Sequence, residues 1–267
     1  MSRKKWLTAH IDKEIAAQVA ENHSLDPFTA LILVSRGITE YEDGEEFFDS
    51  DFCFCDPYLI ADMEEAVIRI EKALENNEKI CVFGDYDADG VTSTALLYSY
   101  LSGAGANVDY YIPDRAGEGY GMNVSAIETL KERGTKLIIT VDNGISAIEE
   151  IEKAKELNID VVVSDHHQAG DVLPDAVAVV DPHRKDCELD FREWAGVGVA
   201  FKLVSALADC DVYDLLEAYG DILAIGTIAD IVALKGENRI LVRAGLAVLN
   251  DALNNGTLRK GLKALID

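Results

Sequence analysis

The chain has 267 residues, 49% of them hydrophobic, which is enough to bury a core in one large domain or two small ones. No segment approaches the ~18 consecutive apolar residues of a membrane-spanning helix, and the first residues lack the apolar core of a signal peptide, so we expect a cytoplasmic protein with no membrane partner. The formal charge of −25 argues against simple nucleic-acid binding through Lys and Arg.

The first 60 residues are expected to form an N-terminal extension. Residues 11–21 and 27–36 have helical spacing, and an acidic run follows them. Residues 40–65 contain eleven Asp and Glu and no Lys or Arg, which is typical of a solvated surface loop. Much of the negative charge is therefore expected to lie away from any functional site.

Helices and strands alternate along the rest of the chain. Helical spacing covers residues 63–77, 91–105, 123–134 and 146–158, and short apolar runs that read as strands cover residues 79–83, 107–113, 136–141, 160–164 and 176–182. Strands separated by helices of ten or more residues indicate βαβ units. The sequence therefore predicts an α/β fold, a parallel sheet with helices on both faces, preceded by the short, mostly helical extension.

Acidic residues and histidines follow the predicted strands at the point where each strand ends. Three carboxylates on alternate residues cannot all stay ionised side by side unless they reach water or bind a cation. An isolated Asp is more often a helix cap, but the carboxyl ends of parallel strands meet at one edge of the sheet, so these side chains together predict one metal site. They are Asp85, Asp87, Asp89, Asp142, Asp165, His166, His167, Asp181 and His183.

Familiar motifs that share these residues fail on spacing. DYDADG matches the start of an EF-hand calcium loop, but Leu96 occupies the twelfth position, where a bidentate Glu belongs. DADGVT resembles the start of haloacid-dehalogenase-like phosphatases, yet that interpretation leaves Asp142 and the SDHH segment without a role. The segment GVGVAF lacks the third glycine of a dinucleotide fingerprint, and residues 84–90 lack the Lys of a P-loop.

Six motifs in order resemble the DHH phosphoesterase superfamily and, within it, the RecJ family of bacterial single-strand-specific exonucleases. They are GDYDADGVTSTA, IPDRAGEGYG, TVDNGIS, SDHH, AGVGVAFKL and GTIADIVAL, at residues 84–95, 112–121, 140–146, 164–167, 195–203 and 226–234. Three of the motifs, IPDRAGEGYG, AGVGVAFKL and GTIADIVAL, are specific to this family within the superfamily. Together the motifs extend over most of residues 45–250.

The resemblance implies a site for two divalent cations, Mn²⁺ or Mg²⁺, and oxygen ligands with imidazole suit these ions. By the family pattern Asp87 and Asp89 each favour a different ion, and Asp142 bridges the two. His166 and Asp230 complete the ligand set, and Asp85 is a further ligand or an orienting residue. An Asp in the apolar stretch around residue 230 is costly unless it is paired or bound to metal.

The implied reaction is phosphodiester hydrolysis by a water that the two metals activate, in the 5′ to 3′ direction on single-stranded DNA. Arg115 and His167 are expected to contact the substrate phosphate, since a guanidinium can bind phosphate through two hydrogen bonds. Asp165 is expected to orient His166 by accepting its other N–H. By resemblance, a single-strand-binding protein and a helicase are partners. The expected catalytic residues are Asp87, Asp89, Asp142, His166 and His167.

The resemblance also divides the chain. We expect an extension at residues 1–60, the DHH catalytic domain at residues 61–250, and the start of a helical connection to a further domain at residues 251–267. Complete relatives have a second domain with a glycine-rich motif and an OB-type domain, and no segment of this chain matches either. We therefore expect the chain to be part of a longer protein.

Two alternatives within the superfamily remain open. Small-substrate phosphodiesterases, which act on oligoribonucleotides or cyclic dinucleotides, typically have a His four residues before the first paired Asp, and Phe83 stands there in this chain. Non-catalytic replication-factor relatives keep the fold and lose the ligands. All the expected ligands are present here, which favours the exonuclease interpretation.

Overall fold

A computed structural model describes residues 10–40, 47 and 54–266 of the chain. It divides the protein into two compact units, Met1–Cys53 and Phe54–Asp267. Residues 41–46 and 48–53 of the acidic run lie outside the described residues. Each unit is described below by itself.

The first unit contains two helices, α1 (Lys13–Asn22) and α2 (Pro27–Ser35). Each begins after an aspartate, Asp12 or Asp26, whose carboxylate accepts hydrogen bonds from two N–H groups of the first turn, which is the preferred N-cap arrangement. A small apolar cluster forms between the helices around Val19, Ala30 and Leu33. The two helices expected near the N-terminus are therefore present.

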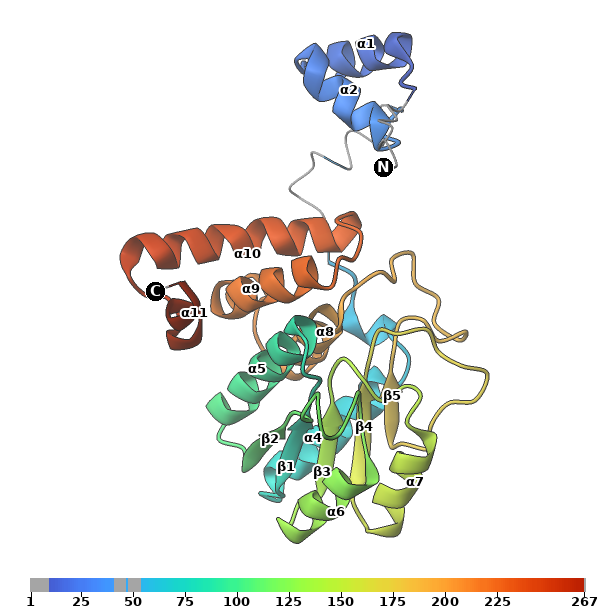
Figure 1. Ribbon diagram of the computed structural model, residues 1–267, viewed down its shortest axis with the longest axis vertical. Helices are drawn as coiled ribbons and strands as arrows, with labels where there is room; N and C mark the ends of the chain where they lie inside the picture. The colour runs from blue at the N-terminus through green and yellow to red at the C-terminus, as the bar shows by residue number, and fades with distance from the viewer. Residues whose placement is uncertain (1–9, 41–46, 48–53, 267) are drawn as a thin grey trace, which may run out of the picture. The chain divides into compact units, whose positions relative to one another are not determined.

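The second unit is built on a five-stranded sheet (Figure 1). All neighbouring strands are parallel, in the order β2-β1-β3-β4-β5. The strands are short and mostly apolar, as expected for a sheet that is covered on both faces. They are β1 (Ile80–Phe83), β2 (Val108–Tyr111), β3 (Leu137–Thr140), β4 (Asp160–Ser164) and β5 (Ala178–Val180).

Helices cover both faces of this sheet (Figure 1). Ile80 and Val82 pack with α4, α5 and α8 on one face, whereas Cys81 and Phe83 pack with α6 and α7 on the other, because successive strand residues point to opposite faces. The predicted fold class is confirmed. The helices of this unit are η1 (Pro57–Leu59, 3₁₀), α4 (Met63–Glu75), α5 (Ala88–Gly103), α6 (Val124–Glu132), α7 (Ile148–Glu156), α8 (Gly196–Leu207), α9 (Val212–Ala229), α10 (Gly236–Asn255) and α11 (Lys260–Ile266).

The ends of two helices determine the surroundings of two candidate ligands. Helix α5 begins at Ala88 instead of residue 91, because the Asp87 carboxylate caps it by accepting the Gly90 N–H at 2.9 Å. Asp89 therefore lies in the first turn of a helix. Helix α9 ends at Ala229, so Asp230 is its C-cap residue and not part of a continuing helix.

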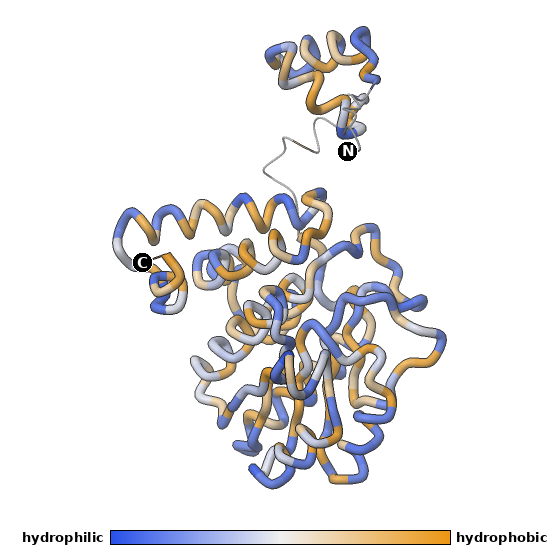
Figure 2. The backbone as a smooth tube through the Cα atoms, viewed as in Figure 1, coloured by the Kyte–Doolittle hydropathy of each residue, from blue (hydrophilic) through white to orange (hydrophobic). Residues whose placement is uncertain are grey.

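The C-terminal helices pack side by side, with α10 against α9 (Figure 1). Hydrophobic and hydrophilic residues alternate along α10, as expected for a helix with one packed and one exposed face (Figure 2). Among the described residues, no helix combines the length and the apolar character needed to cross a bilayer.

Candidate metal centre

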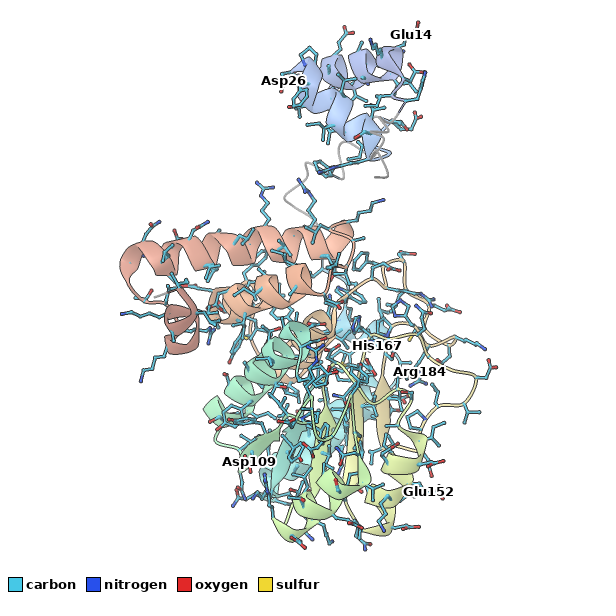
Figure 3. The ribbon with its side chains drawn as sticks, in the orientation of Figure 1. Glu14, Asp26, Asp109, Glu152, His167 and Arg184 are labelled. Atoms are coloured by element: carbon cyan, nitrogen blue, oxygen red, sulfur yellow. The ribbon has the colours of Figure 1, made fainter. Side chains whose placement is uncertain are left out.

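The candidate ligands gather where the order of the strands reverses. Strand β1 lies between β2 and β3, so the chain leaves β1 toward one side and later returns on the other. The carboxyl ends of strands at such a switch point form a ligand site in open α/β sheets. Asp85 follows β1, Asp142 follows β3, and the histidines follow β4; His167 is labelled at these strand ends in Figure 3.

Three groups of side chains bring their ligand atoms within 4.8 Å of one another. Asp142 and His166 each belong to two of the groups, so the groups form one connected cluster. The residues expected from the sequence as ligands are all in it. The groups are Asp85 with Asp87 and Asp142, Asp89 with His166 and Asp230, and Asp142 with His166 and His167.

His166 lies at the middle of the cluster. Its Nε2 is 3.1 Å from Asp142 Oδ1 and 3.8 Å from one carboxylate oxygen of each of Asp89 and Asp230. Burial opposes the charged form of this imidazole, but the Asp142 carboxylate outweighs it and raises the pKa of His166 to about 9. Without a bound cation, the carboxylates around this imidazole therefore favour its protonated form.

Asp89 is held by the N-terminus of α8. Its carboxylate accepts the Gly196 N–H at 2.6 Å and the Val197 N–H at 2.9 Å, two groups that have no partner within the helix. Burial nevertheless raises the pKa of Asp89. The two backbone bonds fix the orientation of this carboxylate without neutralising it.

Two glycines leave room for the ligands. A Cβ at Gly196 would lie 2.7 Å from Asp142 Oδ1, and one at Gly226 would lie 3.1 Å from Asp89 Oδ1 and 2.2 Å from Thr92 Oγ1. Side chains at these positions would displace the carboxylates or the helices that present them. This close approach gives a physical reason for glycine in the motifs AGVGVAFKL and GTIADIVAL.

Among the described residues, the acidic side chains that follow β1 and β3 are buried without a Lys or Arg partner. Asp85 is 1% exposed, and its carboxylate oxygens make no hydrogen bond of good geometry, although the Tyr86 and Gly121 N–H groups lie close enough to act on its pKa. Asp142 is 2% exposed and has a left-handed backbone, with a φ of 62°. Burial raises the pKa of both groups. Buried carboxylates with unused oxygens are suited to hard divalent cations, so the residues present fit Mn²⁺ or Mg²⁺.

Asp165 binds the ring of His167, and here the structure differs from the prediction that it orients His166. Asp165 Oδ1 is 2.7 Å from His167 Nδ1, whereas it meets His166 only through the backbone N–H, also at 2.7 Å. The other oxygen accepts the Ile145 N–H at 2.9 Å. Burial acts against ionisation, but these hydrogen bonds lower the pKa of Asp165. The turn after β4 presents the His167 ring, and not that of His166, to the carboxylate.

Sequence reasoning gave no role to Tyr120, which lies beside the cluster. Its hydroxyl is 3.3 Å from His167 Nε2 and 3.3 Å from the backbone oxygen of Asp142. The flanking residues Gly119 and Gly121 both have positive φ, so the loop turns sharply on each side of it. The sequence EGYG in the second motif, with a glycine on each side of the tyrosine, could have pointed to this residue.

The remaining candidates lie in different surroundings. Arg115 is exposed, and its guanidinium carbon is 5.3 Å from the centre of the Tyr86 ring, between Asp85 and Asp87 in sequence. Asp181 is buried and accepts the His183 N–H at 2.7 Å, but neither residue belongs to the three groups above. The structure thus brings the predicted metal ligands together, whereas Asp181 and His183 lie near His166 without joining a ligand group.

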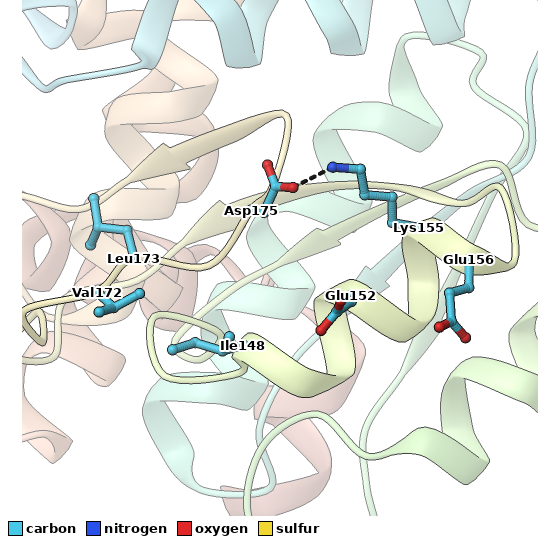
Figure 4. Close-up of a pocket in the computed structure, with 7 residues that line it drawn as sticks. All are labelled: Ile148, Glu152, Lys155, Glu156, Val172, Leu173 and Asp175. Atoms are coloured by element: carbon cyan, nitrogen blue, oxygen red, sulfur yellow. Dashed lines mark hydrogen bonds and ion pairs between the residues drawn. The ribbon is translucent and has the colours of Figure 1, made fainter.

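A shallow depression lies elsewhere, between α7 and the segment that precedes β5 (Figure 4). Lys155 and Asp175 form an ion pair across it. None of the candidate ligands lines it, so we assign it no part in the site. Its lining residues are Ile148, Glu152, Lys155, Glu156, Val172, Leu173 and Asp175.

The chain is similar to known proteins over most of its length. Residues 79–227 match the family described as "DHH family, N-terminal domain". The chain is 45% identical to the single-stranded-DNA-specific exonuclease RecJ of Bacillus subtilis over 99% of its own length and 33% of that protein. It therefore spans about a third of this relative.

Solved structures of such exonucleases share the fold. One, of exonuclease RecJ bound to manganese, is 39% identical with a TM-score of 0.62, over 70% of this chain and 48% of that one. RecJ of Thermus thermophilus in complex with Mn²⁺ is 32% identical with a TM-score of 0.68, over 88% and 33%. Its complex with Mg²⁺ gives 30% identity and a TM-score of 0.57, over 88% and 29%.

Proposed function

The chain belongs to the DHH family, and from that premise we propose that it is the catalytic core of a metal-dependent exonuclease that degrades single-stranded DNA from its 5′ end. The observation that carries the proposal is the convergence of three groups of acids and histidines at the carboxyl ends of β1, β3 and β4. The likeness to exonucleases named RecJ supports the choice of substrate. We assign the catalytic domain to residues 61–250.

We propose that the cluster holds two divalent cations. Asp87 and Asp89 serve different ions, Asp142 bridges them, and His166 and Asp230 complete the set, with Asp85 as a further ligand. When bound, two such cations lower the pKa of the attacking water and stabilise negative charge on the phosphoryl oxygens. The burial of the Asp85 carboxylate without a well-formed hydrogen bond supports this assignment.

Residues around the cluster position the substrate and the ligands. The His167 ring, fixed by Asp165 on one side and approached by the Tyr120 hydroxyl on the other, is 47% exposed and can donate a hydrogen bond to the scissile phosphate. Arg115 is exposed beside Tyr86 and is our candidate for binding the terminal phosphate. By resemblance, we propose a cytoplasmic enzyme that acts with a single-strand-binding protein and a helicase.

Bound divalent cations would allow a protein with a net charge of −25 to bind an anionic substrate. Four added positive charges from two divalent ions would fall among the carboxylates, where the phosphate must approach. Long-range attraction of DNA to the whole domain is not required. We therefore expect activity to depend strongly on the cation and less on basic surface residues.

The test is a nuclease assay with Mn²⁺ on three substrates: 5′-phosphorylated single-stranded DNA, the same strand in a blunt duplex, and a dinucleotide. Release of mononucleotides from the 5′ end of the single strand, absent in an Asp142→Ala variant, is the expected result. Cleavage of the dinucleotide alone would favour a small-substrate phosphodiesterase. Tight binding of Mn²⁺ with no turnover of any substrate would contradict the assignment of this chain as an active core.

A further inference from the structure

A buried ion pair lies outside the metal centre, between α8 and α10. Lys202 of α8 and Glu237 at the start of α10 are 2% and 1% exposed, and Lys202 Nζ is 2.7 Å from Glu237 Oε2. Removing two charges from water costs about as much as their attraction returns, so a buried pair is weak evidence for stability. Its presence therefore needs another explanation.

The pair has a full set of partners. Glu237 accepts the Cys55 N–H at 2.6 Å and the Trp194 indole N–H at 3.1 Å. Lys202 donates to the Cys55 carbonyl at 2.9 Å, and its Nζ is 5.1 Å from the centre of the Trp194 ring. Buried polar groups that are satisfied in this way fix the elements that carry them. The pair thus joins α8, α10 and the segment before η1.

One arm of this network leads to Asp89. Trp194 lies two residues before Gly196, whose N–H binds the Asp89 carboxylate. The Trp194 side chain also packs under the first turn of α8, since a Cβ at Gly198 would lie 3.0 Å from it. Glu237 therefore holds Trp194, the residue before the N-cap of α8, and the N-terminus of this helix holds Asp89.

The other arm leads to Asp230. Only six residues, 231–236, separate Asp230 from Glu237. The buried Asn238 side chain donates to the Ala233 carbonyl at 3.1 Å and also to the Glu193 carbonyl. It therefore joins the segment between Asp230 and Glu237 to the residue before Trp194. A displacement of Glu237 would therefore be transmitted to the backbone that carries Asp230.

We propose that the Lys202–Glu237 pair is a positioning element of the metal centre, which fixes Asp230 relative to the α8 N-terminus that holds Asp89. The proposal rests on the proposed function, because these two carboxylates meet His166 in one of the candidate ligand groups. Metal sites depend on residues behind the ligands, which commonly contribute a factor of about 10–100 in affinity. Lys202 and Glu237 belong to none of the three ligand groups.

The test is Mn²⁺ binding to Glu237→Gln, which keeps the size of the side chain and removes its charge. By calorimetry we expect two binding steps in the unchanged protein and, in the variant, a loss of about 10–100-fold in the step that needs Asp230. The electron paramagnetic resonance signal of a coupled Mn²⁺ pair should give way to that of isolated Mn²⁺. Both measurements are independent of nuclease activity.

Arg69→Met is the matched control. The buried Arg69 also forms an ion-pair network, with the partly exposed Glu78 and the exposed Asp160, but at the opposite end of the strands. It should lower the melting temperature and leave both Mn²⁺ steps unchanged.

Three results would overturn the inference. The first is a folded Glu237→Gln protein with both Mn²⁺ steps and the coupled signal intact. The second is an equal loss of binding in Arg69→Met, since the effect would then follow from stability alone. If Glu237→Gln does not fold, Trp194→Phe takes its place, because it removes a single N–H donor to Glu237. Unchanged Mn²⁺ binding in Trp194→Phe is the third result. Absence of Mn²⁺ binding in the unchanged protein would instead refute the proposed function, and this inference with it.

Discussion

The acidic groups at the two ends of the sheet differ in the counter-charge that the chain gives them. At the amino ends of the strands, Arg69 of α4 donates from Nε to Asp160 and from Nη2 to Glu78, each at 2.7 Å. At the carboxyl ends, Asp85, Asp89 and Asp142 are each no more than 2% exposed. Among the residues that the structure describes, no Lys or Arg forms an ion pair with any of these three.

The difference separates a structural charge cluster from a functional one. Where the chain supplies its own guanidinium, the acids are neutralised, and the network joins α4 to β4 and to the segment before β1. At the other end, the basic groups that the described residues place beside the acids are the imidazoles of His166 and His167, and two such groups cannot compensate all the carboxylates. The counter-charge must then come from solution, which is the physical basis for expecting cations there.

The largest expected effect is that of Asp142→Ala. Because a bridging carboxylate serves both ions, we expect the loss of at least one Mn²⁺ and a fall in activity of about a thousandfold, or several kcal/mol of transition-state stabilisation. Calorimetry with Mn²⁺ and the nuclease assay measure the two effects. Asp175→Ala is the control, since Asp175 is 79% exposed in a surface ion pair. Equal Mn²⁺ binding in both variants would contradict the assignment of Asp142 as the bridging ligand.

Gly226→Ala should damage the same end of the sheet through packing alone. Its added methyl group would lie 2.2 Å from Thr92 Oγ1 and 2.8 Å from Val197 Cγ1, and overpacking of this kind costs about 1–3 kcal/mol. We expect weaker Mn²⁺ binding, because α9 carries Asp230 and α8 holds Asp89. Gly103→Ala, with open space around the new methyl group, should bind Mn²⁺ normally. Normal binding in Gly226→Ala as well would show that α9 can shift without disturbing the ligands.

Asp165→Asn should have an intermediate effect. Asp165 fixes the His167 ring at 2.7 Å and is not in any of the three ligand groups, so we expect activity to fall by about 10–100-fold with the Mn²⁺ content retained. Metal analysis of the purified variant, together with its rate on single-stranded DNA, tests this. Loss of Mn²⁺ along with activity would mean that Asp165 supports the ligand turn as a whole instead of orienting His167.

The sequence was sufficient to predict the fold and where the ligands meet. Short apolar runs separated by amphipathic helices indicate a parallel sheet, and the carboxyl ends of such strands share one edge. That rule predicts that Asp85, Asp142 and His166 lie close together, and the structure places them in one connected cluster. Local periodicity and topology decide these features.

Contacts between distant segments were not predictable in this way. The Asp165 carboxylate pairs with His167 because of the particular path of the turn after β4, which a sequence pattern does not specify. Glu237 meets Trp194 and Lys202 across 43 and 35 residues of sequence. The sequence KGEN at residues 235–238 is typical of an exposed helix N-terminus and gives no indication of a buried ion pair. Such pairings depend on how helices pack, and no local periodicity encodes them.

Arg69→Met should have the smallest effect on the metal centre and so tests the comparison from its other side. Removing this guanidinium leaves Glu78 and Asp160 without their common partner, and hydrogen bonds to charged groups are worth about 1.5–3 kcal/mol each before allowance for solvent. Because Asp160 is 51% exposed and Glu78 is 23% exposed, water can replace part of this loss, so we expect a decrease in unfolding free energy of about 1–3 kcal/mol. Urea unfolding without metal measures it. Mn²⁺ affinity should stay within about twofold, since additivity holds for sites that share no partner. A clear loss of Mn²⁺ binding would mean that the two ends of the sheet are coupled, and that a cluster with its own counter-charge also supports the site that lacks one.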